Sequence, residues 1–423
     1  VGSNGNTIIK AENDINIKND VNSVYVESNQ KRSGFLSSYK KETRDYTEQA
    51  VGSNIVGNNV VLKAGDDVNV QGSNLIGKED SKGNGGNIYI TSGDDVNIIE
   101  GTLDESHYSY EKKSGFSTNF SGGLGGVTGG ITYSTSKTKQ TSEMTNIAVS
   151  QVKADGNIVI NAGDTVESHA TKFKADDMSV VAENDIKLLD AQETYKQDYS
   201  NKTTSIGVSV SISSPITSLI NTGVNVRNNI KDDSYGFDRQ DQSINTLFNG
   251  FQDIRDIARD NSIIRETIAG KRKPTDLVDV SIGVNFSTSS TTSHQEGANS
   301  VAGTIDVNNL NLTSNNGNVE LVNQQVNVAQ NMNVKADDFI VRAGKSTFES
   351  ENSSRSVGAG ASFNPLSGAV TPSANYSQSN GNMEGTTYNN SHITVGGNTT
   401  INTTGDMILS GADLVTNTID GNI

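Results

Sequence analysis

One short pattern recurs four times along this chain and limits its fold more than any other feature. Each copy is a run of alternating apolar residues that ends in a turn of small residues and a carboxylate. The copies lie at residues 53–67, 150–165, 302–317 and 391–406. Alternation with a period of two is typical of a β-strand with one buried face. Because one copy cannot bury its own apolar face, the repetition predicts a solenoid in which each coil covers the next.

The turns between the runs set the length of one coil. Where no insertion intervenes, neighbouring turns are 20 residues apart (Ala162 to Ala182) or 28 residues apart (Ala64 to Ser92). About 20 residues is one coil of a parallel β-helix, which has three short strands per coil and a spacing of about 4.8 Å between coils. Together, the stretches of the chain with this repeat pattern are long enough for about eleven coils.

Segments of a second kind interrupt the coils. They alternate apolar residues with Ser, Gly or Asn near residues 33–39, 114–120, 205–212, 281–286 and 356–363. Their period again indicates strands, and their polar flanks favour β-hairpins or longer loops extruded from the solenoid. We therefore expect coils over residues 1–30, 51–106, 143–196, 294–349 and 389–423. The extruded segments are expected over residues 31–50, 107–142, 197–293 and 350–388.

Two finer expectations concern the coils. Residues 157–185 align with residues 318–346 at a constant offset of 161, so Ala175 and Ala336 are predicted to occupy the same corner of the cross-section. The alternating apolar residues of the coils are predicted to face the interior. This set contains Val68, Val70, Val96, Ile98, Ile158, Ile160, Ile186 and Leu188.

The third extruded segment carries a helical pattern over about residues 242–270. Its apolar stripe has a helical period and includes Phe248, Phe251 and Ile254. Such a helix would pack on the flank of the solenoid or cap an exposed strand edge. Alternatively, it would face a partner or a membrane, which the basic run at 271–273 favours.

The charge balance and the cysteine content limit the partners and the chemistry. A net charge of −16 argues against nucleic acid, whose phosphates would be repelled. The chain has no cysteine, which excludes disulfides, thiolate metal sites and a cysteine nucleophile. It begins at Val1 without a signal-peptide pattern, so we read it as an internal fragment of a larger protein. No apolar stretch reaches the about 18 residues of a spanning helix.

No residue pattern in the chain points to catalysis. The four histidines are dispersed, and we expect structural or surface roles for them. The Asp66/Asp67 and Asp94/Asp95 pairs could divide acid and base roles or bind calcium, but an aspartate after glycine is also what a tight turn needs. Residues 122–130 are rich in glycine yet lack the lysine of a phosphate loop. We expect no enzyme activity, no cofactor and no metal.

Several of these segments, taken in order, resemble a known family. AGDDVNV (64–70) and SGDDVNI (92–98) are followed by the SGFS hairpin (114–117), NIVINAGDT (157–165) and AENDIKLLDAQETY (182–195). This order is similar to the second haemagglutinin-repeat region of filamentous-haemagglutinin and contact-dependent-inhibition exoproteins. The resemblance covers most of the chain and is weakest over residues 214–277.

The resemblance implies an all-β fold, a right-handed parallel β-helix with extruded hairpins, to which the helical pattern over about 242–270 adds one helical insertion. It also implies a segment of a very large protein exported to the bacterial cell surface through the outer-membrane transporter of a two-partner system. The expected partner is the target-cell outer membrane or a surface receptor, and the expected role is toxin delivery. A host-cell adhesin is the alternative, a structural spacer is a third reading, and a β-helix polysaccharide-active enzyme is a remote one.

The extruded strands supply the candidate contact residues. Two alternatives are open for their apolar faces: they pack against each other or on the solenoid flank, or they insert into a target membrane, where every strand edge must be paired. With the three helix residues, the candidates are Ile206, Val208, Val210, Ile212, Val280, Ile282, Val284, Phe286, Phe248, Phe251 and Ile254.

Overall fold

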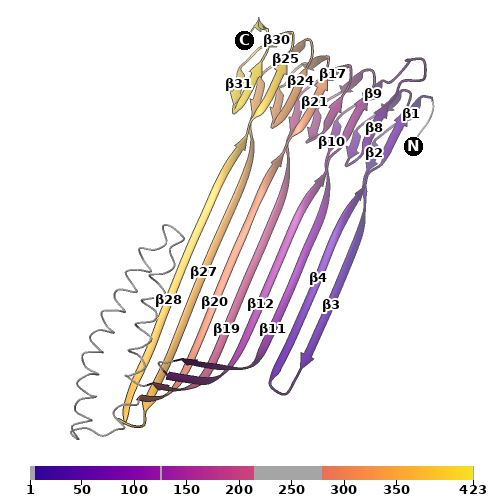
Figure 1. The fold of residues 1–423 in the computed structure, drawn as a ribbon. Helices are drawn as coiled ribbons and strands as arrows, with labels where there is room; N and C mark the ends of the chain where they lie inside the picture. The colour runs from indigo at the N-terminus through magenta and orange to yellow at the C-terminus, as the bar shows by residue number, and fades with distance from the viewer. Residues whose placement is uncertain (1–4, 124–125, 214–278, 423) are drawn as a thin grey trace.

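A computed structural model describes residues 5–123, 126–213 and 279–422, and in it three parallel sheets stack into a β-helix (Figure 1). Sheet 1 contains β1 (Thr7–Lys10), β6 (Val60–Lys63), β9 (Ile88–Thr91), β14 (Ile158–Ala162), β17 (Asp177–Ala182), β22 (Asn309–Ser314), β25 (Met332–Ala336), β30 (Asn398–Thr403) and β33 (Thr418–Asn422). Sheet 2 contains β2 (Ile15–Lys18), β7 (Val68–Gln71), β10 (Val96–Ile99), β15 (Val166–His169), β18 (Ile186–Leu189), β23 (Val319–Val322), β26 (Phe339–Arg342) and β31 (Met407–Ser410). Sheet 3 contains β5 (Asn54–Gly57), β8 (Asn74–Gly77), β13 (Gln151–Ala154), β16 (Lys172–Lys174), β21 (Gly303–Val307), β24 (Gln324–Val328), β29 (Ser391–Val395) and β32 (Ala412–Val415).

The interior of the coils is a continuous apolar core. All eight residues predicted to face inward are at most 1% exposed, as is the largest core side chain, Phe339. Outward-facing asparagines stack from coil to coil as amide ladders, in which Asn97 Nδ2 donates to Asn69 Oδ1 (3.0 Å) and Asn69 Nδ2 to Asn16 Oδ1 (3.2 Å). The predicted inward alternation is therefore confirmed.

The number of coils is lower than the sequence indicated. The described residues form eight complete coils and one further strand of sheet 1, rather than about eleven. The sequence predicted too many coils because each hairpin begins earlier than expected. The first strands of the four hairpins start at Asp20, Gly101, Ala191 and Gly344. The alternation of the last coil strand continues into the hairpin, so period alone does not mark where the chain leaves the coil.

The predicted equivalence of Ala175 and Ala336 is wrong. Ala175 lies between β16 and β17, at the corner between sheets 3 and 1. Ala336 ends β25, at the corner between sheets 1 and 2. Both corners turn with a small residue followed by two aspartates, and the offset of 161 matched these similar turns across different corners.

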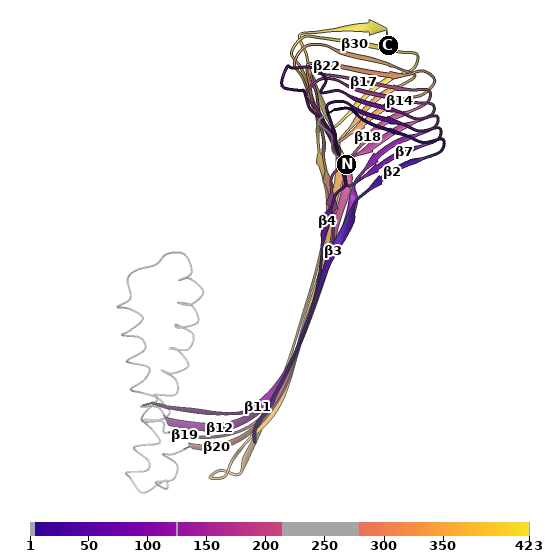
Figure 2. The same cartoon turned by 90° about the vertical axis from the view of Figure 1, so that its right-hand side faces the viewer.

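Four hairpins form a second body, which we call the blade. It is one antiparallel sheet of eight strands that extends away from the coils as a single layer (Figure 2). The two segments near 205–212 and 281–286, expected as separate hairpins within the extruded segment 197–293, are opposite strands of the same hairpin. The hairpin strands are β3 (Asp20–Ser33), β4 (Ser37–Val51), β11 (Gly101–Gly123), β12 (Gly126–Ala148), β19 (Ala191–Ser213), β20 (Asp279–Val301), β27 (Gly344–Asn364) and β28 (Ala369–Asn389).

Every hairpin leaves at the corner between sheets 2 and 3, and only every second coil has one. In the other four coils a short turn closes this corner. Each of these turns has one residue with a positive φ: Gly72 (52°), Ala170 (46°), Asn323 (49°) and Gly411 (66°). A left-handed residue turns the chain tightly there, and glycine or asparagine adopts that conformation at lowest cost.

The root of each hairpin is closed by one hydrogen bond across the gap it leaves. A side chain at the start of the sheet 3 strand donates to the carbonyl oxygen of the last residue of the sheet 2 strand. Three serines do this: Ser53 Oγ to Lys18 (2.7 Å), Ser150 Oγ to Ile99 (2.7 Å) and Ser391 Oγ to Arg342 (2.6 Å). At the β19–β20 hairpin, Gly303 holds the equivalent position, and Gln324 Nε2 from the next coil donates to Leu189 instead (3.0 Å).

Replacing Val96 by Asp should destabilise the coils by several kcal/mol, because Val96 is fully buried and the new carboxylate would have no partner. The control is Tyr89→Asp on the exposed side of β9, which should change stability little. Thermal unfolding and limited proteolysis measure both variants. Equal stability of the two would contradict the inward orientation of Val96.

Replacing Ser150 by Ala should cost about 1–3 kcal/mol, since the buried Ser150 hydroxyl donates to the Ile99 carbonyl and accepts a hydrogen bond from the amide of Ser73, and the substitution removes both bonds. Faster proteolysis near the root of the β11–β12 hairpin should accompany the loss. The exposed Ser106 of β11 is the matched control, and Ser106→Ala should be neutral. If both alanine variants are cleaved at the wild-type rate, the hydrogen bond does not hold the root.

Candidate functional site

The end of the blade farthest from the coils carries an apolar face. On β19 and β20 every second residue is apolar, and the register sets these residues directly opposite each other. Residues directly opposite in an antiparallel pair share one face of the sheet. The pairs are Ile206 with Phe286, Val208 with Val284, Val210 with Ile282, and Ile212 with Val280.

Neighbouring strands widen this face to six strands. On β12 and β11 it continues through Ile131 and through the Phe116–Tyr133 pair, whose ring centroids are 4.9 Å apart. On β27 and β28 it continues through Phe363 and Val370. We call the whole set the apolar face; the opposite side of these strands presents Ser, Thr, Gly and Asn.

No described residue covers the apolar face. Ile206 and Val208 are 51% and 50% exposed, and Phe120 is 80% exposed. The strands lie side by side in one layer, away from the coils (Figure 2), so their apolar faces pack neither against each other nor on the flank of the solenoid. An exposed apolar area of this kind marks a contact site for a protein or a membrane.

The remaining candidates fall outside the described residues. The helix expected over about 242–270, with Phe248, Phe251 and Ile254, lies within 214–278, as does the basic run at 271–273.

Each of the four histidines forms an ion pair or hydrogen bond with at least one carboxylate, which their dispersal in the sequence did not indicate. The register joins residues that are far apart in the chain. The pairs are His107 with Asp45, His169 with Glu100 and Glu167, His294 with Asp198 and Glu296, and His392 with Asp413.

His169 joins a coil to the root of a hairpin. Its Nδ1 lies 3.2 Å from Glu100, the residue before β11, and its Nε2 lies 2.8 Å from Glu167. The hydrogen bond with Glu100 is the main cause that raises the pKa of His169. Burial is the largest single influence on Glu100 and acts to raise its pKa, but the hydrogen bond from His169, a backbone hydrogen bond and the charge of His169 together outweigh it, and the pKa of Glu100 is lowered.

The second aspartate of each pair stabilises the turn. Asp67 Oδ1 accepts a hydrogen bond from the amide of Asp95 in the next coil (3.1 Å), and Asp95 Oδ1 accepts one from the amide of Thr165 (3.0 Å). Burial is the main cause that raises the pKa of Asp95. These carboxylates continue from coil to coil as a ladder, which accounts for the aspartate at this turn position.

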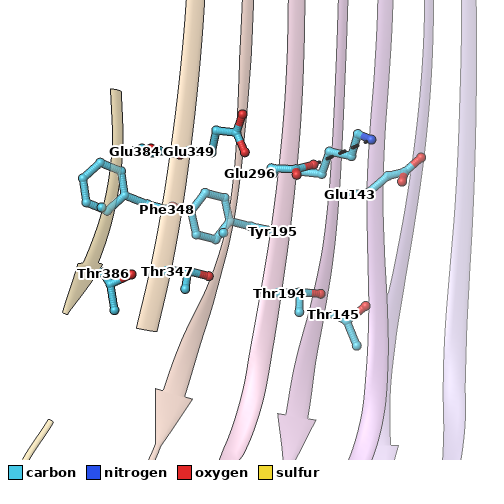
Figure 3. A pocket seen from close by; sticks show the side chains of 13 residues that line it. Glu143, Thr145, Thr194, Tyr195, Glu296, Thr347, Phe348, Glu349, Glu384 and Thr386 are labelled. Carbon is cyan, nitrogen blue, oxygen red and sulfur yellow. Dashed lines mark ion pairs between the residues drawn. The ribbon is translucent and has the colours of Figure 1, made fainter. Parts of the chain in front are cut away.

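An acidic row crosses the blade nearer the coils (Figure 3). Glu296, Glu349 and Glu384 lie on the adjacent strands β20, β27 and β28. Lys196 of β19 stands between Glu296 and Glu143 of β12, and its Nζ is 3.9 Å from Glu296. Both side chains of that ion pair are about half exposed. Within residues 5–123, 126–213 and 279–422, no group of three or more histidines and carboxylates is arranged to hold a metal ion.

Comparison with models of protein families identifies the family of this chain. The hemagglutinin-repeat model matches residues 33–145, 131–236 and 284–423, which is most of the sequence, and the chain therefore belongs to the hemagglutinin-repeat family. The match indicates a filamentous-haemagglutinin-like exoprotein of the two-partner secretion type. No curated protein and no solved structure matches the chain. In the described part of the chain, no helix has the length and apolar character needed to cross a membrane.

His169 gives stability a pH dependence. Because its pKa is raised on folding, its contribution is fully present below its ordinary pKa of about 6.5 and is lost as pH rises through the folded value. The lowered pKa of Glu100 keeps that carboxylate charged down to acidic pH. We expect His169→Gln to cost about 1 kcal/mol near pH 5.5 and much less near pH 8.5.

Denaturant unfolding of the wild type and His169→Gln at both pH values measures this difference. His392→Gln is the control, because His392 and Asp413 are each more than half exposed and such pairs contribute little. A stability difference that is independent of pH would show that protonated His169 does not stabilise the root.

Proposed function

We propose that this chain is part of a large secreted cell-surface exoprotein and that its blade contacts the outer membrane of a target cell during toxin delivery, as in contact-dependent inhibition. The observation that carries the proposal is the exposed apolar face at the end of a long single-layered sheet. Strands of 23 residues extend about 75 Å. A surface held so far from the coils can reach a membrane that the coils do not touch.

The apolar face is long enough to enter a lipid layer. The stretch from Ile206 to Ile212 covers 7 residues of β19, about 23 Å of extended strand, and a strand that crosses a membrane completely has about 9–11 residues. Its alternation of apolar and small polar residues is that of outer-membrane strands, whose apolar side faces lipid. The polar side would then face the other strands or water.

Insertion also requires partners for the strand edges. At the tip, β28 and the part of β11 beyond Phe116 each lack a neighbouring strand on one side among the described residues. Backbone groups left unpaired in hydrocarbon cost several kcal/mol each. Further strands must therefore close the sheet, from other hairpins of the exoprotein, from a second copy or from a receptor in the membrane.

Adhesion to a host cell is the alternative function. The same apolar face, held away from the coils, would bind a protein receptor, and it would then bind pure lipid poorly. Binding to protein-free vesicles therefore distinguishes the two functions.

Val208→Asp combined with Val284→Asp should reduce sedimentation with outer-membrane lipid vesicles at least about tenfold, because it puts two carboxylates directly opposite each other on the apolar face. The matched control is Ser205→Asp with Ser287→Asp. These residues are also directly opposite each other on β19 and β20, but on the polar side.

The control should keep most of the binding. Equal loss in both variants would mean that binding depends on charge or on the integrity of the hairpin, and no loss in either would mean that the apolar face does not contact lipid. In the full-length exoprotein, toxin delivery should follow the same order.

A further inference from the structure

We propose that a row of basic side chains across the blade binds the phosphate groups of anionic lipid headgroups. This inference deepens the proposed function and rests on it. The residues of the row are at the same register position on the five adjacent strands β3, β4, β11, β12 and β19. After β20, the row also includes a residue of β27. Its members, which we call the basic row, are Lys31, Lys40, Lys112, Lys137, Lys202 and Arg355.

The register brings these residues together. Lys31 is directly opposite Lys40, Lys40 opposite Lys112, Lys112 opposite Lys137, and Lys137 opposite Lys202. The row continues through Ser290 to Arg355. With strands about 4.8 Å apart, the five lysines form a line about 19 Å long.

The basic row lies on the same side of the sheet as the apolar face. Lys202 precedes Ile206 by four residues, and Lys112 likewise precedes Phe116, so each pair points to one side. Between the two lies a threonine rung, in which Thr204 Oγ1 and Thr288 Oγ1 are 3.3 Å apart. The order along this side is therefore apolar, threonine, lysine.

Aromatic side chains mark the border of the apolar face on the side of the basic row. Phe116, Tyr133 and Phe286 are in one rung with Ile206, the last apolar rung before the threonines. Aromatic residues gather where a membrane protein passes from hydrocarbon to headgroups, and lysines extend their charges into the headgroup layer. From Ile206 to Lys202 the strand rises about 14 Å, and less along the membrane normal if the strands tilt.

The protein itself leaves this charge largely uncompensated. Like charges directly opposite each other destabilise a sheet. Lys40 is paired with Glu42, but no carboxylate among the described residues forms an ion pair with Lys112, Lys137 or Lys202. The repulsion therefore lacks an internal partner in a chain whose net charge is −16. An external array of anions would remove it.

An anionic membrane surface fits this line of charges best. It presents many phosphates in a plane, and each lysine near such a surface contributes about 1 kcal/mol to binding. The neighbouring apolar face supplies the second contact that a membrane offers and a free phosphate ion does not. Nucleic acid would meet the repulsion of the acidic remainder of the chain.

The test replaces Lys112, Lys137 and Lys202 by Gln in the complete chain. The control replaces Arg32, Lys41 and Lys113 by Gln, which removes the same charge from the other side of the blade. Sedimentation compares vesicles of phosphatidylcholine alone with vesicles that also contain phosphatidylglycerol, with and without excess inorganic phosphate.

We expect the wild type and the control to bind the anionic vesicles at least about tenfold more tightly than the neutral ones, and the Lys112/Lys137/Lys202 variant to lose that preference. Its thermal stability should stay equal or rise, because repulsion is relieved. Inorganic phosphate should compete weakly. An unchanged lipid preference, an equal loss in the control, or a clear loss of stability would each overturn the proposal.

The two proposals fail in different ways. If the apolar face is not a membrane contact, Val208→Asp with Val284→Asp leaves binding to neutral vesicles unchanged, whatever the basic row does. If the basic row does not bind headgroups, neutral-vesicle binding still depends on the apolar face, but the anionic preference survives the lysine substitutions.

Discussion

The spacing of β-strands is the constraint on which the rest of this molecule depends. Coils of the β-helix and strands of the blade are both about 4.8 Å apart. A hairpin has two strands, so it occupies the height of two coils, and hairpins occur on every second coil. A hairpin on every coil would have no room. The match lets four hairpins join into one sheet in continuous register.

Because only every second coil carries a hairpin, the corner between sheets 2 and 3 has two forms. Coils without a hairpin close it with a left-handed residue such as Gly72 or Ala170. Coils with a hairpin hold it with a side-chain hydrogen bond such as that of Ser150. Where Gly303 cannot supply the bond, Gln324 of the adjacent coil does. The roots of the hairpins are thus fixed by the coils, which positions the blade.

The blade has no interior of its own. Its strands are held by their ladders and by polar pairs across them, and near the coils the rings of Tyr195 and Phe348 cover Gly297 and Gly385 on neighbouring strands. The apolar residues at the tip therefore do not pack into a core and remain exposed. The basic row and the acidic row on the same strands add a charge gradient along the sheet. Such a gradient orients the blade relative to a charged surface.

The sequence by itself determined the strands and the side that each presents. Period-two alternation identified the inward valines and isoleucines of the coils and the apolar residues of the hairpins, because the pleat alone sets that period. The small-residue and aspartate motifs also indicated the turns, and the order of these motifs resembled the haemagglutinin-repeat family, which the family match confirms. Each of these depends on contacts within a few residues or on direct stacking of similar coils.

Only the tertiary structure decided which strands are neighbours. The period of a strand does not identify its partner. It therefore does not distinguish similar turns at different corners, does not join the two strands of the β19–β20 hairpin, and does not separate the root of a hairpin from a coil strand. For the same reason Lys31 and Lys202, far apart in the chain, stand in one row only because four hairpins pair in register. The stacking of the coils sets that register, and no local pattern in the sequence records it.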